Sequence, residues 1–160
     1  MVQTEMVAKE IRLNTVGITI IDAMLLSFKE AKTLLTRTER AYNHWWWLRS
    51  PGYNSFIAAS VRSDGDIDGH GRLANGVSDA VRPALKIKNI KSSNLQIGDK
   101  FEFGGKTFKI ISKNIAFCEG DIGIHCFNKD FRVQKTNDYK KSDVKKFVDE
   151  WFEHAKACNI

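Results

Sequence analysis

The apolar residues near the carboxyl end of the chain recur with the spacing of an amphipathic helix. Between residues 144 and 155 they fall at i, i+3, i+4, i+7, i+8 and i+11, and Ser142 stands at the N-cap position. A capping-box sequence, SFKE at residues 27–30, predicts a second main helix, because its Ser and Glu side chains each satisfy a free backbone N–H. Residues 4–13 predict a short third helix, with apolar positions four apart on one face.

A different pattern, typical of strands, fills the middle of the chain. From residue 45 to residue 90, short apolar pieces alternate with turn sequences such as PGYN, SDGD and DGHG, which predicts a twisted β region. The sequence FEFGGKTFKII, residues 101–111, predicts a hairpin with a Gly-Gly turn, and residues 115–126 predict a further strand or two. We therefore expect one α+β domain over residues 1–160, with a twisted antiparallel sheet and two main helices.

Three consecutive tryptophans begin the β region. In a strand, successive side chains point to opposite faces, so Trp45 and Trp47 share one face and Trp46 shares the other with Leu48. At least one of these faces is expected to be core, which makes packing the main role of the triplet. The alternative is an exposed Trp in a binding patch, since aromatic and Arg side chains dominate contact energies.

Composition and charge narrow the class of protein. Of the 160 residues, 42% are hydrophobic and 28% are charged, which is typical of a globular chain. The net charge of +6 permits an anionic partner, nucleic acid included, or simply a solvated basic surface. The apolar run TVGITIIDAMLL is too short to span a bilayer and contains Asp22, and no export signal is recognisable. Three cysteines without a C-x-x-C pair fit a reducing compartment, so we expect a cytoplasmic protein with no membrane partner.

No pattern in the sequence supports a cofactor, a metal or catalysis. The sequence GGKT at residues 104–107 lacks the first Gly of a phosphate-binding loop. The sequence DGDIDG at residues 64–69 resembles the start of a calcium loop, but Asn75 stands where a bidentate Glu is needed, so two Asp-Gly turns are the favoured interpretation. The chain's cysteines and its carboxyl-terminal histidines lack the close pairing of structural zinc sites, and no nucleophile elbow is present.

Three motifs carry a resemblance to a known family. The sequences WWLRSPG, SVRSDGDI and AVRPALKI resemble the closing half of a domain of unknown function common in bacteria and their phages, whose signature is WWLRSPG followed by GVRPAL. Ala80 replaces the Gly of that second motif. The resemblance covers residues 1–90 and implies a C-type-lectin-like fold, akin to the formylglycine-generating enzyme and to phage receptor-binding modules.

Residues 91–160 are similar to the opening half of the same family. LQIGDKFEFGGKTFKIIS resembles its first hairpin, and NDYKKSDVKKFVDEWFEHA resembles its helix. The halves are thus in reversed order, which a circular permutation, a domain-swapped dimer or fragments of two tandem copies would explain. Permutation is favoured because lectin-like folds pair their first and last strands. It predicts that strands 81–87 and 101–103 are adjacent and antiparallel, in a monomer or between the chains of a swapped dimer.

The resemblance implies a non-enzymatic binding module of phage or mobile-element origin that recognises a protein or a glycan. The alternative is a small intracellular phage-encoded inhibitor that binds a host nuclease or its nucleic acid. The candidate ligand-binding residues lie in or beside the turn-rich segment and are Arg49, Tyr53, Asn54, Arg62, Asp64, Asp66, His70 and Arg72. For Arg49 a structural role is an equal alternative, in which it pairs with a buried carboxylate and locks its strand.

Overall fold

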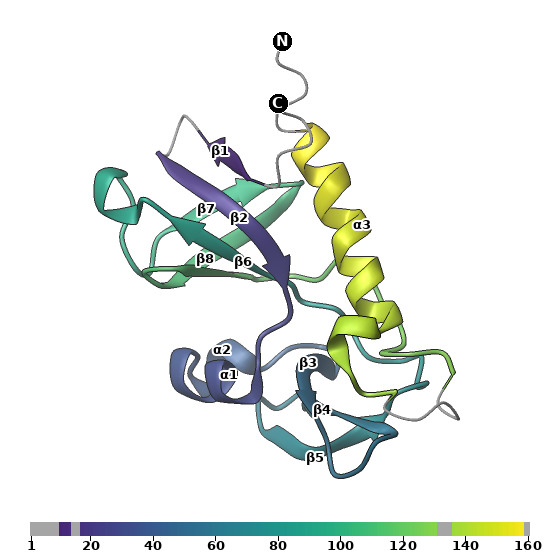
Figure 1. Cartoon of the computed structure of the whole chain (residues 1–160). Helices are drawn as coiled ribbons and strands as arrows, with labels where there is room; N and C mark the ends of the chain where they lie inside the picture. Colours follow the sequence, from purple (N-terminus) through teal and green to yellow (C-terminus); the bar gives the residue numbers. More distant parts are fainter. Residues whose placement is uncertain (1–9, 14–16, 131–135, 159–160) are drawn as a thin grey trace.

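The structure is a computed structural model that describes residues 10–13, 17–130 and 136–158, and it contains two antiparallel sheets. Figure 1 shows the larger sheet above, the smaller sheet below, and one long helix beside both. The larger sheet has the strand order β1 (Ile11–Leu13), β2 (Ile18–Met24), β6 (Ala84–Lys88), β9 (Ile115–Cys118), β8 (Lys106–Ser112) and β7 (Lys100–Phe103). The smaller sheet has the order β3 (Trp46–Pro51), β4 (Ile57–Val61) and β5 (Ile67–Leu73). The chain is therefore an α+β protein.

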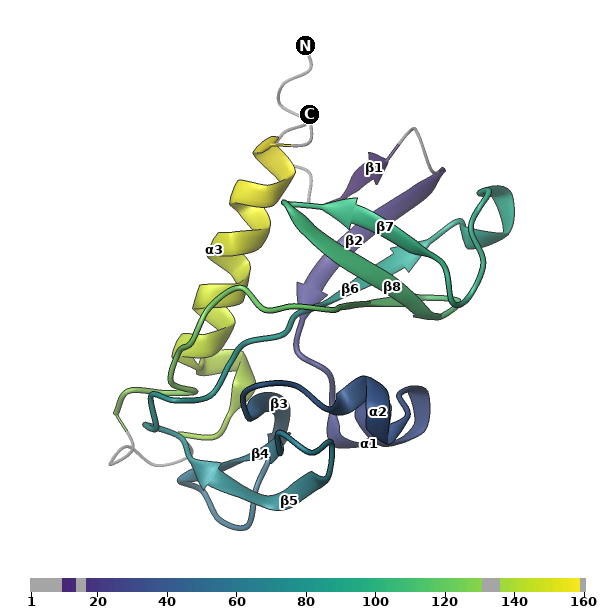
Figure 2. The same cartoon turned by 180° about the vertical axis from the view of Figure 1, so that it is seen from behind.

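Both predicted main helices are present, and their caps are those expected from the sequence. Ser27 and Glu30 form the capping box of α1 (Phe28–Leu34), and a second short helix, α2 (Arg37–Arg40), follows directly. Ser142 accepts a hydrogen bond from the backbone N–H of Lys145 at the start of α3 (Asp143–Cys158). Two 3₁₀ turns, η2 (Ile90–Ser92) and η3 (Tyr139–Lys141), complete the helical elements of the described residues. The view from behind in Figure 2 again places α3 alongside the larger sheet, and the closest of its strands to α3 is β2.

The predicted hairpin is confirmed as β7–β8. Its two turn residues, Gly104 and Gly105, have φ angles of +62° and +76°, a left-handed backbone conformation that favours glycine. A Cβ atom on Gly104 would lie 2.6 Å from the Cβ of Ala155 on α3, so glycine at this position also permits the close approach of the helix.

Two predictions about the strands are wrong. Residues 11–13, expected to be helical, form the edge strand β1 that pairs with β2, and residues 4–9 lie outside the described residues. Strands 81–87 and 101–103 are not adjacent, because β6 pairs with β9, and both β9 and β8 lie between β6 and β7. The burial patterns explain this order: all four residues of β9 are buried, which suits a central strand, whereas β7 alternates exposed and buried residues as an edge strand does.

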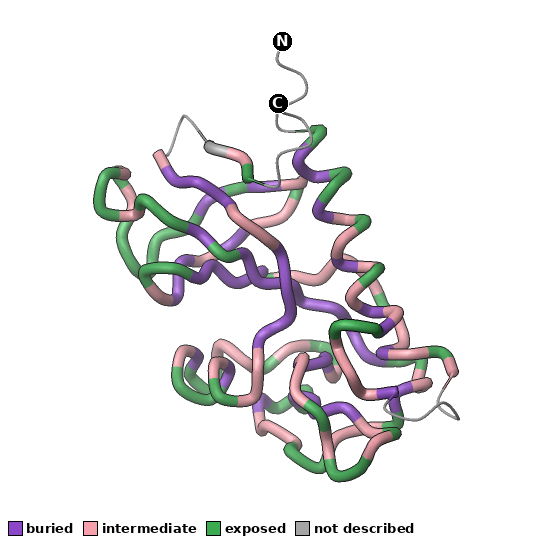
Figure 3. Tube along the Cα trace, in the orientation of Figure 1, coloured by how far each residue is buried: buried purple, intermediate pink, exposed green. Residues whose placement is uncertain are grey.

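Trp46 and Trp47 pack the core on opposite faces of β3, as the alternation of side chains predicts, whereas Trp45 precedes the strand and is only partly buried. Trp46 and Leu48 belong to one buried cluster and Trp47 to another, and all three are 0% exposed. The indole N–H of Trp47 donates to the carbonyl oxygen of His125 at 2.8 Å, so its polar atom is satisfied inside the protein. Figure 3 shows these buried stretches continuing from the small sheet into the large one.

A buried arginine, Arg82, connects the small sheet to the large sheet. The guanidinium carbon of Arg82 lies 4.4 Å from the ring centre of Tyr42, 4.9 Å from that of Trp46 and 4.5 Å from that of Phe117. Its nitrogens donate to the backbone carbonyl oxygens of residues 40, 118, 119 and 120. Burial lowers the pKa of Arg82 to about 10, so the guanidinium stays charged at neutral pH.

Replacing the Arg82 guanidinium should destabilise the whole fold. Arg82→Lys keeps the charge but loses the forked hydrogen bonds to several carbonyls, and we expect the free energy of unfolding to fall by about 3 kcal/mol. Urea denaturation followed by tryptophan fluorescence measures this change. Arg62→Lys, at an arginine whose side chain is half exposed, is the matched control and should cost well under about 1 kcal/mol. Equal losses in the two variants would contradict a special role for Arg82.

Candidate functional site

The turn segment, residues 53–77, presents an exposed aromatic pair. The Tyr53 side chain is 73% exposed, and its ring stacks on the imidazole of His70 with 5.2 Å between ring centres and an angle of 13°. The backbone N–H of Tyr53 also donates to the carbonyl oxygen of His70 at 2.9 Å. Two predicted site residues that are 17 positions apart in the sequence thus form one flat surface.

Further exposed apolar side chains lie on the same segment. Leu73 is 54% and Val77 is 76% exposed, and Phe56 is also exposed. The backbone N–H of Ala74 donates to the carbonyl oxygen of Phe56, and Leu73 pairs across the sheet with Ile57, so the loops that carry Phe56 and Val77 meet at one end of the small sheet. Exposed large apolar residues that gather in one segment are typical of a contact surface.

Hydrogen bonds from another part of the chain hold the first turn of this segment in place. The side-chain oxygen of Asn54 accepts from the N–H of Phe56 at 2.9 Å. The Asn137 amide donates to the carbonyl oxygens of Asn54 and Ile57, and Thr136 donates to that of Ser55. The turn is therefore fixed before any ligand arrives, which lowers the entropic cost of binding.

Arg62 and Arg72 are arranged around Trp45 rather than pointing freely into solvent. The guanidinium carbon of Arg72 lies 4.3 Å from a ring of Trp45, and that of Arg62 lies 5.5 Å away. The Nε of Arg72 is 2.9 Å from a carboxylate oxygen of Asp79, which is 1% exposed. Burial raises the pKa of Asp79, while the nearby Arg72 favours the charged form. Arg72 therefore neutralises a buried carboxylate, a structural role.

Asp64 and Asp66 form a turn and remain half exposed. One oxygen of Asp64 accepts from the backbone N–H of Asp66 at 3.0 Å, and Arg37 lies 3.3 Å from both carboxylates. This is the Asp-Gly turn that the sequence favoured over a calcium loop. Within the part of the chain that is described, no three His, Cys, Asp or Glu side chains are grouped so as to hold a metal ion.

Arg49 binds a carboxylate on the neighbouring helix. It donates to both oxygens of Glu30, at 2.7 and 3.2 Å, and to the carbonyl oxygen of Leu25 at 2.7 Å. Burial acts to raise the pKa of Glu30, but the hydrogen bonds from Arg49 and from the Ser27 backbone outweigh it and hold the pKa below its usual value. Arg49 thus has the structural role that the sequence left open, because it ties β3 to the start of α1.

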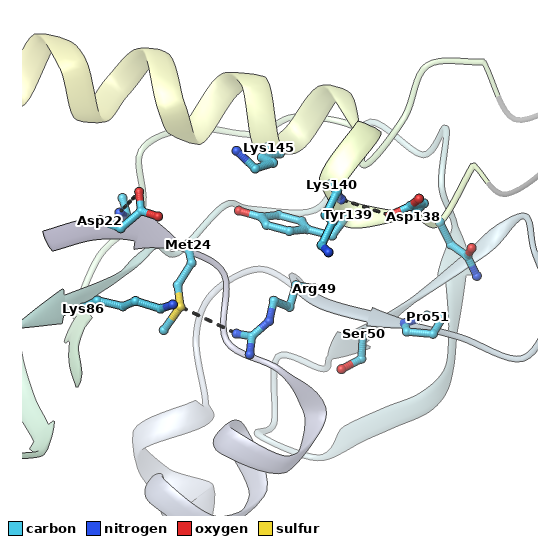
Figure 4. Close-up of a pocket in the computed structure, with 12 residues that line it drawn as sticks. Asp22, Met24, Arg49, Ser50, Pro51, Lys86, Asp138, Tyr139, Lys140 and Lys145 are labelled. Atoms are coloured by element: carbon cyan, nitrogen blue, oxygen red, sulfur yellow. Dashed lines mark hydrogen bonds between the residues drawn. The ribbon is translucent and has the colours of Figure 1, made fainter. Parts of the chain in front are cut away.

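A cavity of about 610 Å³ lies where β2, β3, β6 and η3 meet (Figure 4). Four of its lining side chains are cationic and two are carboxylates. The full lining is Asp22, Ala23, Met24, Arg49, Ser50, Pro51, Lys86, Asn137, Asp138, Tyr139, Lys140 and Lys145. Except for Arg49, none of these was a candidate from sequence. The sequence pointed to them only through the basic stretch KTNDYKKSDVKK at residues 135–146, in which acidic residues offset part of the positive charge.

Comparison with known proteins identifies the family of this chain. A family model described as a domain of unknown function, DUF6273, matches residues 8–89, more than half of the chain. The chain belongs to this family. No curated protein and no solved structure matches it. The DUF6273 match contains the three consecutive tryptophans, Arg49, Arg82 and the turn segment. The elements η3 and α3 lie outside it, so the cavity is lined by residues from both sides of the boundary. None of the described helices is long and apolar enough to cross a membrane.

The Arg49–Glu30 pair predicts a stability loss with a specific pH dependence. Arg49→Ala leaves the half-buried Glu30 without its partner, and we expect a loss of about 2 kcal/mol at neutral pH. Because the folded-state pKa of Glu30 is lowered below its unfolded value of 4.5, the pair's contribution is fully present above that pH and disappears as pH falls through the lower, folded-state pKa.

Urea denaturation of the parent and of Arg49→Ala, from pH 7 down to pH 3, measures this difference. The two unfolding free energies should converge at the acid end of the range. A gap that is independent of pH would mean that Arg49 stabilises the fold through packing alone.

Proposed function

We propose that the protein is a non-enzymatic binding module that recognises a protein or a glycan through the turn segment. The observation that carries this proposal is the exposed Tyr53–His70 stack on a turn that Asn137 holds in place. A flat aromatic surface of this kind suits the apolar face of a sugar ring or an apolar side chain of a protein. The exposed Leu73 and Val77 add apolar area to the same segment, which favours a protein partner.

The type of fold and the order of its two halves are also part of what we propose. We infer a C-type-lectin-like domain of phage or mobile-element origin with its two halves in permuted order, supported by the motif resemblance of residues 1–90 and 91–160. In this arrangement the halves join through the pairing of β6 with β9. Joining at a central strand differs from the first-to-last pairing expected at the outset, but it still builds one sheet from both halves.

A second candidate function is an inhibitor that binds a host nuclease or its nucleic acid. The net charge of +6 favours it, because phosphate contacts depend on Lys and Arg side chains. Titration of the full chain with random-sequence duplex DNA at increasing salt tests the nucleic-acid form of this function. We expect binding at low salt with a steep loss of affinity as salt rises if phosphates are contacted. No binding at low salt would remove nucleic acid as a partner.

Substitution of exposed side chains on the turn segment should abolish partner binding without changing stability. The double variant Tyr53→Ala, Leu73→Ser removes exposed side chains only, so its melting temperature should stay close to that of the parent. Parent and variant are compared on a glycan array and on a library of displayed bacterial surface proteins, and ligands of the parent should lose at least tenfold in affinity for the variant.

The matched control is Ile97→Ser, which removes another exposed apolar side chain, 62% exposed, outside the turn segment. The control should keep the binding of the parent. Ligands that bind the double variant as tightly as the parent would overturn the assignment of the turn segment.

A further inference from the structure

The cavity between the sheets collects cations from four separate elements. Arg49 comes from β3, Lys86 from β6, Lys140 from η3 and Lys145 from α3. Figure 4 shows Lys86 and Lys140 reaching toward the cavity from opposite sides of the Arg49 guanidinium. Side chains from both the DUF6273-matched part and the rest of the chain thus converge on one space.

Only two of these cations have a partner of opposite charge. Arg49 binds Glu30, and Lys145 lies 2.6 Å from Asp149, one turn along α3. The ammonium groups of Lys86 and Lys140 form no hydrogen bond or ion pair with any described residue. Two donors are therefore free to bind a ligand.

The carboxylates that line the cavity are engaged with the backbone. One oxygen of Asp22 accepts from the N–H of Ala23 at 2.9 Å, and one oxygen of Asp138 accepts from the N–H of Lys140 at 3.1 Å. Arg49 and Lys145 are already paired with Glu30 and Asp149, so the attraction of the cavity for an anion depends on Lys86 and Lys140.

A buried hydroxyl provides an independent observation. The Tyr139 oxygen is buried; the backbone N–H of Leu25 faces it, but the hydroxyl itself donates to no acceptor in the described structure. Figure 4 shows its ring lying across the cavity with the hydroxyl directed toward β2, where Asp22 and Met24 lie. Burial raises the pKa of Tyr139, so the group is a protonated donor at neutral pH. Buried polar atoms are almost always satisfied, so this donor calls for an oxygen acceptor.

We propose that this cavity binds a small anionic molecule whose carboxylate or phosphate group accepts hydrogen bonds from Lys86, Lys140 and the hydroxyl of Tyr139. The apolar part of the ligand lies against Met24, Pro51 and the ring of Tyr139, which line the same space. This site is separate from the turn segment, and it adds a small-molecule ligand to a protein proposed to recognise a macromolecule.

Isothermal titration calorimetry of the full chain at low ionic strength tests the site, with inorganic phosphate and citrate as probes. Binding of either probe supports the site, and the tighter one identifies the anion source. Lys86→Gln and Lys140→Gln should each weaken binding by on the order of tenfold, the effect of one charge-assisted hydrogen bond. Lys86 and Lys140 are both exposed at the cavity rim, so these variants should fold normally.

The matched control is Lys141→Gln, since Lys141 is exposed, adjacent in sequence and absent from the lining. Its affinity should stay within about twofold of the parent, because a solvent-exposed charge that does not contact the ligand contributes little. A loss equal to that of Lys140→Gln would show diffuse attraction and overturn the proposal, as would a parent that binds neither phosphate nor citrate.

Tyr139→Phe separates ligand binding from folding. Because the hydroxyl donates to no acceptor in the described structure, its removal should leave the melting temperature of the ligand-free protein close to that of the parent. The affinity for the better probe should fall several-fold. A clearly lower melting temperature together with unchanged affinity would show that the hydroxyl serves the fold and not a ligand.

Discussion

The buried guanidinium of Arg82 is the constraint on which the two sheets depend. Its stacking on Tyr42 and Trp46 holds the segment that leads into the small sheet, and its hydrogen bonds to residues 118–120 hold the end of β9 in the large one. The buried apolar residues of β3 and β4 belong to clusters that also contain residues of the large sheet, so the small sheet is stable only as part of this shared core. Arginine suits the position because one planar group serves several carbonyls and three aromatic rings together.

Local chemistry explains which elements the sequence predicted. The caps at Ser27 and Ser142 and the Gly104-Gly105 turn depend on backbone atoms within a few residues, and those rules operate in any tertiary context. The order of the strands has no such local cause. The β9 strand takes the place beside β6 because all its side chains must be buried on both faces, and that requirement involves neighbours about 30 residues away in sequence. The apolar spacing of residues 4–13 predicted a helix, but residues 11–13 form the short edge strand β1. Its pairing with β2 is another contact that local spacing does not contain.

The candidate site was predictable to the extent that residue type determines role. Tyr53 and His70 are exposed, as their sequence context of turn residues predicted. The charged candidates required knowledge of their partners. Arg72 meets Asp79, and Arg49 meets Glu30, through strand and helix packing that no spacing rule contains. The cavity lay furthest from prediction, since its lining residues come from segments separated by up to about 120 positions.

The segment that joins these surfaces is residues 136–141. Thr136 and Asn137 hold the turn at Asn54 and Ser55, while Tyr139 and Lys140 line the cavity. This short segment contacts both the turn segment and the cavity, so a shift of its backbone at the cavity would disturb its hydrogen bonds to the turn segment. An occupied cavity that fixes Tyr139 and Lys140 would therefore reduce the motion of the turn segment as well, because the same backbone carries both sets of contacts. The turn segment and the cavity are therefore connected through one short stretch of chain.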